Sequence, residues 1–164
     1  HSNPMPIGTK SSKIDISSEK DTKLISQRIS KYLRNGDKLF LYGEVGVGKT
    51  TFVKYLINFL QNNLNEKLTE IPSPTFNIVN EYLIKKQKLI HYDLYRIKDE
   101  SELVNIGLFE ETEDAILFIE WPEIIKRKLN KKIELYFDYE ENFNKRSLII
   151  STDSREEIVN EFKK

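Results

Sequence analysis

The sequence predicts one α/β domain, and three features of the 164-residue chain lead to that class. A short apolar strand over Asp37–Tyr42 is followed by a glycine loop and then by a helix from about Lys49 to Leu60. A continuously apolar segment, Ala115–Ile119, is typical of a strand covered on both faces. Further strand and helix patterns alternate around these segments, with no repeat or linker between them. Such alternation indicates an α/β fold.

The elements around this central unit follow from periodicity and capping signals. Ser18, with Asp21 three residues later, marks the start of a helix, and Gly36 marks its end. Residues 62–70 are polar and are predicted to form a loop, and the prolines at 72 and 74 exclude a helix there. The remaining strands are expected at 13–16, 76–84, 88–97, 132–139 and 146–152, the last two forming a hairpin across 140–145. The remaining helices are expected at 100–107, at 122–128 and after a cap at Ser154.

The glycine loop carries the pattern G-x-x-x-x-G-K-[ST], which predicts a phosphate-binding P-loop. Glycines let main-chain N–H groups turn toward a phosphate, and the following helix adds the positive end of its dipole. Lys49 can reach the β- and γ-phosphates, and the Thr50 hydroxyl can ligate Mg²⁺. We therefore expect the chain to bind a nucleoside triphosphate. The predicted binding residues are Gly43, Glu44, Val45, Gly46, Val47, Gly48, Lys49, Thr50 and Thr51.

Two acids stand at the ends of predicted strands, where ligands of open α/β sheets bind. Glu120 follows the apolar strand directly, and Asp93 lies near the end of its own strand. With Lys49 they form the predicted catalytic set, and with Thr50 the predicted metal ligands. The alternative interpretations are a helix-capping acid for Glu120 and a solvent-facing strand acid for Asp93. His91, on the same strand face as Asp93, is assigned no role.

Three other features allow two interpretations each. Thr75 follows a proline-stiffened loop and is either a switch residue that senses a γ-phosphate or a plain strand-entry threonine. Trp121 either anchors the sheet edge, which we favour, or stacks on a partner. The basic residues at 126–128 and 131–132 fit a solvated helix end better than a contact with RNA.

Composition narrows the class of protein. The chain has 26 Lys and Arg residues and 26 Asp and Glu residues, a balance that argues against tight independent binding to RNA or DNA. The absence of Cys excludes disulfides and thiolate catalysis. No apolar run approaches the roughly 20 residues of a membrane span, and no signal peptide is evident, so a cytoplasmic protein is expected. Because the only Met is Met5, residues 1–4 are interpreted as a vector-encoded remnant and 5–164 as the domain.

Five segments together resemble the TsaE family (formerly YjeE), the P-loop ATPases of bacterial tRNA threonylcarbamoyladenosine synthesis. They are GEVGVGKTTF (43–52), SPTFNIVNEY (73–82), HYDLYR (91–96), ELVNIGL (102–108) and IEWPE (119–123), in the family's order and spacing. The resemblance implies a P-loop NTPase-like three-layer sandwich with a mixed, mainly parallel central sheet flanked by helices.

The same resemblance implies ATP and Mg²⁺ as ligands and the TsaD and TsaB proteins as partners, with tRNA contacted indirectly through them. ATP hydrolysis would then reset the partner complex between turnovers. By motif, Thr50 and Glu120 serve the metal, and Asp93 serves the metal or catalysis. The first 36 residues match the family only loosely, so the resemblance assigns no residue to the adenine, and a contact from Asp21 or Thr22 is left open.

Other classes of nucleotide-binding protein fit less well. A small-molecule P-loop kinase needs paired lid arginines, whereas those after the loop, Arg96, Arg127, Arg146 and Arg155, are widely separated. A GTPase needs an Asn-Lys-x-Asp motif, and the segment at 130–133 lacks its Asp. A nucleotide-gated adaptor with little hydrolysis remains open as an alternative.

Overall fold

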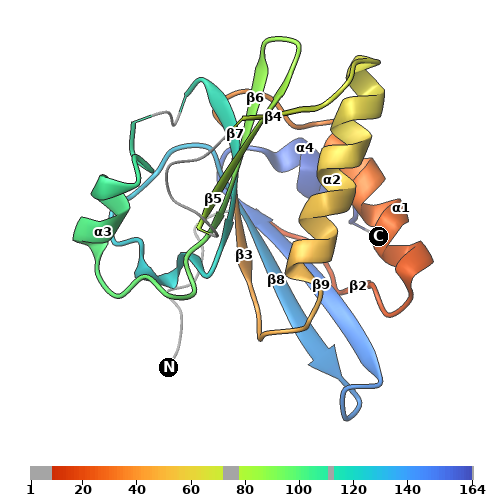
Figure 1. The fold of residues 1–164 in the computed structure, drawn as a ribbon. Helices are drawn as coiled ribbons and strands as arrows, with labels where there is room; N and C mark the ends of the chain where they lie inside the picture. Colours follow the sequence, from red (N-terminus) through yellow and green to blue (C-terminus); the bar gives the residue numbers. More distant parts are fainter. Residues whose placement is uncertain (1–8, 72–77, 111–112, 164) are drawn as a thin grey trace.

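A mixed sheet of nine strands forms the centre of the computed structural model, which describes residues 9–71, 78–110 and 113–163 (Figure 1). The neighbouring strands β8, β3, β7 and β6 run parallel, and antiparallel strands extend the sheet on both sides of them. From edge to edge the order is β1 (Thr9–Lys10), β9 (Lys145–Thr152), β8 (Lys132–Glu140), β3 (Lys38–Tyr42), β7 (Ala115–Glu120), β6 (Gln87–Asp93), β5 (Val79–Ile84) and β4 (Thr69–Ile71), with β2 (Ile14–Asp15) paired to β9.

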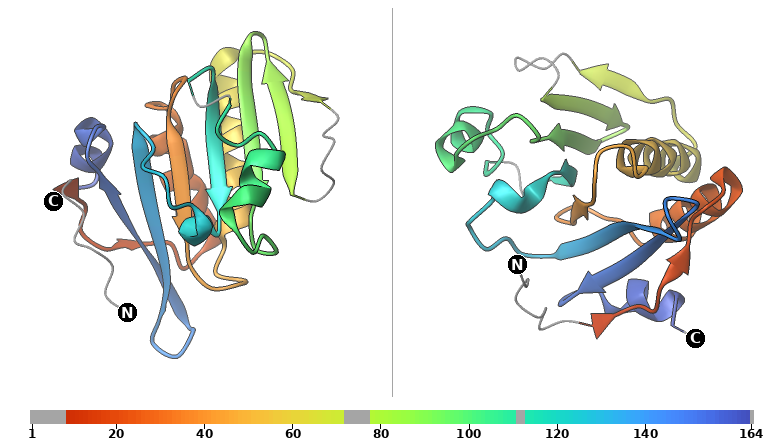
Figure 2. Two further views of the ribbon diagram at one scale, coloured as in Figure 1. Left: turned by 90° about the vertical axis from the view of Figure 1, so that its left-hand side faces the viewer. Right: turned by 90° about the horizontal axis from the view of Figure 1, so that it is seen from below.

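Helices cover both faces of this sheet and produce three layers (Figure 2). One face carries α1 (Glu19–Ser30), α2 (Lys49–Leu64) and α4 (Glu156–Glu161). The other carries α3 (Glu100–Asn105) and the 3₁₀-helix η1 (Pro122–Ile124). The predicted α/β sandwich with a mixed sheet is confirmed, and the parallel pairing is confined to the central strands.

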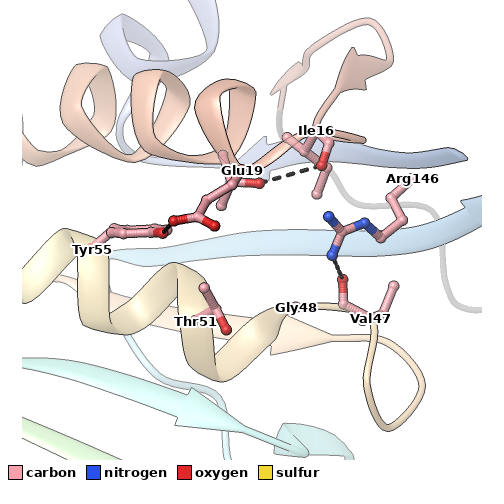
Figure 3. A pocket seen from close by; sticks show the side chains of 8 residues that line it. Ile16, Glu19, Val47, Gly48, Thr51, Tyr55 and Arg146 are labelled. Carbon is pink, nitrogen blue, oxygen red and sulfur yellow. Dashed lines mark hydrogen bonds between the residues drawn. The ribbon is translucent and has the colours of Figure 1, made fainter.

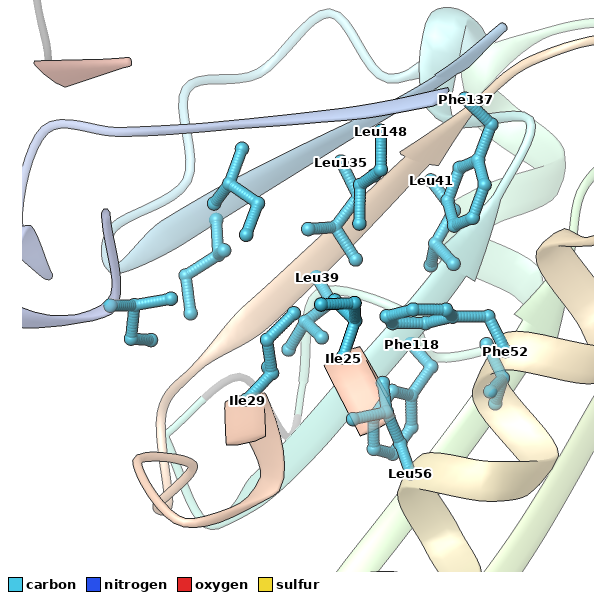
Figure 4. Packing of buried hydrophobic residues seen from close by; sticks show 14 of the residues in the cluster. Ile25, Ile29, Leu39, Leu41, Phe52, Leu56, Phe118, Leu135, Phe137 and Leu148 are labelled. Carbon is cyan, nitrogen blue, oxygen red and sulfur yellow. The ribbon is translucent and has the colours of Figure 1, made fainter. Parts of the chain in front are cut away.

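Alternating side chains of the central strands build a separate core on each face. Leu39 and Leu41 of β3 point toward α1 and α2, whereas Phe40 points toward the face that α3 covers. On the α2 side, the ring of Phe52 meets the ring of Phe137 edge-on, with 5.4 Å between their centroids (Figure 4). This packing fixes α2, and with it the glycine loop, against β3 and β8.

Several local predictions are confirmed. The Ser18 hydroxyl accepts a hydrogen bond from the Asp21 N–H at 3.0 Å and caps α1. All residues of β7 are buried, as the apolar run predicts. Strands β8 and β9 form the predicted antiparallel hairpin.

The boundaries around residues 62–97 differ from the prediction. Helix α2 continues to Leu64 and ends at Asn65, whose left-handed backbone (φ 52°) stops it. Thr69–Ile71, predicted as loop, forms β4 because β5 offers it a pairing edge. Strand β6 ends early, at Asp93, whose side chain accepts the N–H of Tyr95 and turns the chain. Residues 76 and 77 lie outside the described residues.

The predicted helix at 122–128 is wrong beyond its first turn. It ends at Ile124, since Ile125 is extended (ψ 114°). One oxygen of Glu100 accepts the main-chain N–H groups of Lys126 at 2.7 Å and Arg127 at 3.0 Å. Those amides are therefore held by another segment and not by a helix of their own.

Helix α4 begins without the predicted Ser154 cap. The hydroxyl of Thr152 accepts the N–H groups of Ser154 at 3.2 Å and Arg155 at 3.1 Å instead. The buried Arg155 guanidinium donates to the buried carboxylate of Asp37, just before β3. This ion pair ties the C-terminal helix to the central strand.

Candidate active site

The glycine loop joins the end of β3 to the start of α2, and its shape depends on two of its glycines. Gly43 has φ 148°, and a Cβ there would lie 2.9 Å from the Phe137 carbonyl oxygen. Gly48 precedes the helix in a left-handed conformation with φ 114°, which disfavours other residues. The loop therefore curves over the N-terminus of the 16-residue helix α2, where unpaired N–H groups favour anions.

Lys49 is buried inside this loop. Its Nζ donates to the carbonyl of Gly43 and lies 3.7 Å from the centroid of the Trp121 ring. Burial lowers the pKa of Lys49 below its ordinary value, and the nearby negative charges, chiefly that of Glu120, oppose this only in part. The ammonium is thus held in a site that an anion would stabilise.

The two predicted acids lie side by side at the strand ends. Asp93 of β6 and Glu120 of β7 are partners in the parallel register. The Thr50 hydroxyl lies 2.9 Å from both Glu120 carboxylate oxygens, and only 3% of Glu120 is exposed. Strand and helix thereby bring Thr50, Asp93 and Glu120 together.

His91 is a site residue to which the sequence assigned no role. Its Nε2 lies 2.6 Å from Oε2 of Glu120. Burial acts to raise the pKa of Glu120, but the hydrogen bonds from His91 and Thr50, together with the electrostatic effects of His91 and Lys49, bring this pKa below its ordinary value. The alternation of β6, which puts His91 on the same face as Asp93, was the one available signal.

A cavity of about 300 Å³ opens between the loop and the strand ends. It includes most of the predicted binding, catalytic and metal residues. Its described lining consists of Val45, Gly46, Gly48, Lys49, Thr50, Thr51, Asp93, Tyr95, Glu120 and Trp121. Of the other predicted residues, Gly43 accepts from Lys49, the carbonyl of Glu44 accepts from the N–H of Val47 at 3.2 Å, and Thr75 lies outside the described residues.

A second cavity, of about 220 Å³, lies on the other side of the loop, between α1 and α2 (Figure 3). Gly48 and Thr51 line both cavities. The Tyr55 hydroxyl donates to Glu19 at 2.6 Å across its wall, and the Arg146 guanidinium donates to the Val47 carbonyl at 3.3 Å. Thr22 also lines this cavity, whereas Asp21 is not among its lining residues.

The oxygen ligands beside the loop fit a magnesium ion that is shared with phosphates. In the described part of the chain, no cluster of three or more His, Cys, Asp or Glu side chains could hold a metal by itself. Mg²⁺ prefers hard oxygen ligands and is commonly bound by one or two carboxylates together with substrate phosphates and water. The Thr50 hydroxyl with the carboxylates of Glu120 and Asp93 provides such a partial set.

Two features outside the phosphate cavity bear on the remaining predictions. Trp121 is partly buried and packs against the core on the α3 face of the sheet, as favoured from the sequence. Its ring also faces Lys49. The side chain of Arg127, in the basic segment, lies 4.0 Å over the ring of Phe109. Within residues 9–71, 78–110 and 113–163, no helix is both long and apolar enough to cross a membrane.

The fold and the loop define a mixed α/β protein with a glycine loop between its central strand and a helix. A sequence profile described as "Threonylcarbamoyl adenosine biosynthesis protein TsaE" matches residues 16–148. The chain belongs to this TsaE family.

Individual relatives agree with this assignment. The tRNA threonylcarbamoyladenosine biosynthesis protein TsaE of Rickettsia conorii is 34% identical over 142 residues, which are 86% of this chain and 78% of the relative. The protein of the same name from Aquifex aeolicus is 40% identical over 108 residues, or 66% of this chain and 74% of the relative. The crystal structure of Bacillus subtilis YdiB has the same fold, with a TM-score of 0.68 at 22% identity over 94% of each chain.

Proposed function

We propose that this chain binds Mg·ATP at the Gly43–Thr50 loop and hydrolyses it, as the ATPase of tRNA threonylcarbamoyladenosine synthesis. The observation that best supports this is the meeting of Lys49 and Thr50 from α2 with Asp93 and Glu120 from adjacent strand ends. A cation for phosphate oxygens and hard oxygen ligands for Mg²⁺ stand together there.

Each side chain has a distinct part in the proposed reaction. Water attacks the γ-phosphorus, the bond to the bridging oxygen breaks, and ADP and phosphate leave. Lys49 would exchange its present contacts for phosphate oxygens, and Thr50 and Glu120 would hold Mg²⁺, which neutralises phosphate charge when bound. Asp93, at the same strand end, would orient the attacking water and accept its proton, or join the metal ligands.

The second cavity would receive the base and ribose of the nucleotide. It shares Gly48 and Thr51 with the first, so one ligand can extend from one cavity into the other over the loop. Thr22 and Tyr55 on its wall would contact the base.

Partner proteins would cover the nucleotide end of the molecule, and the TsaD and TsaB proteins are the proposed partners. Val45 and Tyr95 beside the cavity are 66% and 60% exposed. Phe143, at the tip of the β8–β9 hairpin, is 69% exposed, and its ring packs on that of Tyr139. Aromatic side chains are enriched at protein–protein interfaces, so the exposed rings of Tyr95 and Phe143 are candidate contacts for a partner. With no net charge, the chain would meet tRNA in the cytoplasm indirectly, through these partners.

The cavity between the glycine loop and the strand ends does not support the kinase alternative. Its wall, as far as the structure describes it, contains no arginine that could serve as a phosphate-clamping lid residue. Arg155 forms an ion pair with Asp37, and the guanidinium of Arg127 lies over the ring of Phe109.

An ATPase assay with and without the cognate TsaB and TsaD proteins tests the proposal, with Glu120→Gln as the variant. We expect the partners to stimulate hydrolysis. Glu120→Gln should still bind ATP but hydrolyse it about a hundredfold more slowly, because a charged oxygen ligand is lost. If Glu120→Gln hydrolysed ATP at the wild-type rate, Glu120 would not take part in catalysis. Phosphate transfer to a metabolite without partner stimulation would favour a kinase.

A further inference from the structure

The contact between His91 and Glu120 joins two buried polar groups of neighbouring strands. Only 11% of the His91 side chain and 4% of the Glu120 side chain are exposed. The separation of 2.6 Å between Nε2 and Oε2 is that of a short hydrogen bond. Such a contact between buried groups constrains the orientation of both side chains.

The direction of this hydrogen bond follows from the state of the carboxyl group. A glutamate side chain is ionised at neutral pH, and its carboxylate can only accept. The proton therefore resides on Nε2 of His91, which donates to Oε2.

Thr50 alone cannot hold the carboxylate in this orientation. Its single hydroxyl proton is shared between two oxygens at equal distances of 2.9 Å. If the Thr50 oxygen turns toward a cation, as proposed above, its proton is redirected away from Glu120. The carboxylate is then free to rotate toward the Lys49 ammonium, which lines the same cavity. His91 is the donor that stays in place during this change.

We propose that His91 is a positioning residue that keeps the Glu120 carboxylate aimed at the Thr50 hydroxyl and away from Lys49. This inference rests on the proposed function, because the orientation matters for holding Mg²⁺ beside the phosphates. Residues that orient a metal ligand in this way typically change metal affinity or activity 10- to 100-fold when they are replaced.

Two substitutions separate hydrogen bonding from packing. His91→Gln keeps an N–H donor at nearly the reach of Nε2, whereas His91→Leu fills similar space without a donor. Asn80→Leu is the matched control, because Asn80 is the exposed register partner of His91 on the neighbouring strand β5. If His91→Leu does not fold, His91→Asn replaces it, since its amide reaches only as far as Nδ1.

The main measurement is the gain in affinity for a non-hydrolysable ATP analogue that Mg²⁺ produces, by calorimetry with Mg²⁺ or with EDTA. We expect His91→Leu to lose this gain by about 10- to 100-fold, with affinity in EDTA unchanged. His91→Gln should recover most of the gain, and Asn80→Leu should match the wild type. In the partner-stimulated assay, kcat should fall in His91→Leu more than KM rises.

Two results would overturn the inference. One is a wild-type Mg²⁺-dependent gain in His91→Leu. The other is an equal loss in His91→Gln and His91→Leu when both unfold at the wild-type temperature, since the donor would then be irrelevant. Failure of the wild-type protein to hydrolyse ATP with its partners would instead refute the proposed ATPase, while the calorimetric comparison would still decide the role of His91.

Discussion

Two buried lysines lie near opposite ends of the central strand, and their surroundings differ. Lys38, at the start of β3, is 1% exposed, and its Nζ donates to the carbonyls of Gly36 and Asn130, each at 2.8 Å, and to Glu113 at 3.3 Å. Lys49, beyond the end of β3, is 4% exposed. Among the described residues, its one hydrogen-bond acceptor is the Gly43 carbonyl.

The difference separates a lysine whose charge is satisfied within the protein from one whose charge can still be satisfied by a ligand. A buried ammonium is stable only when acceptors replace the water it has lost. The three oxygens around Lys38 do so within the protein. Lys49 has one oxygen and the face of Trp121, and its pKa is lowered by burial. Burial alone therefore does not mark a lysine as a candidate for ligand binding, but burial with an incomplete set of acceptors does.

The largest effect is expected at Lys49, whose set of hydrogen-bond acceptors is incomplete. Lys49→Met should weaken ATP binding more than about 1,000-fold, or about 4 kcal/mol, because the main cation for the phosphates is lost. The free energy of unfolding should stay the same or rise, since an under-solvated charge is removed. Calorimetric titration with ATP and urea denaturation measure the two quantities. Retained ATP affinity would show that Lys49 is structural like Lys38.

Replacing Lys38, at the other end of β3, with Met should lower the stability of the fold and leave ATP binding unchanged. Lys38→Met leaves the buried carbonyl of Gly36 and the carbonyl of Asn130 without the donor from Lys38 and should destabilise the fold by about 2–3 kcal/mol. ATP affinity of the folded protein should be unchanged, because the site lies at the other end of the strand. An unaltered urea midpoint would contradict the structural role of Lys38.

The smallest effect on stability is expected at Glu113, which accepts hydrogen bonds from Lys38 and Lys131. Hydrogen bonds from Lys131 and Lys38 lower the pKa of Glu113 below its ordinary 4.5. Because the folded-state pKa is the lower one, this contact stabilises the fold above about pH 4.5, and its contribution disappears as the pH falls through the folded-state value.

The loss should be less than about 1 kcal/mol, since Glu113 is 54% exposed and its ion pairs are screened. Urea denaturation between pH 6 and pH 3 should show a slightly steeper loss of stability for wild type than for Glu113→Gln. Identical profiles would mean that the Glu113 contacts do not contribute to stability.

The sequence was informative where structure is determined by nearby residues. The buried strand β7, the β8–β9 hairpin and the Ser18 cap depend on runs, turns and spacings within a few positions. The loop from Gly43 to Thr50 was recognised because its glycines and Lys49 stand at fixed intervals. Glu120 was found because an acid directly after a buried strand needs a partner.

The missed features depend on contacts between distant segments. The helix after Pro122 stops early because Glu100 accepts the N–H groups that would have continued it. The role of His91 depends on β6 lying beside β7, and the sequence alone did not provide that strand order. The pairing of Arg155 with Asp37 spans most of the chain and leaves no local pattern.

The parallel register of β6 and β7 determines how the spacing of the Asp93 and Glu120 carboxylates would be lost on heating. Asp93 and Glu120 are register partners, so main-chain hydrogen bonds between strands about 4.8 Å apart set their spacing. That spacing changes only when the sheet itself separates. Heating therefore abolishes it in the same cooperative transition that melts the core, and not in an earlier local one. The side-chain contacts to Thr50 and His91, by contrast, can break and re-form while the protein stays folded.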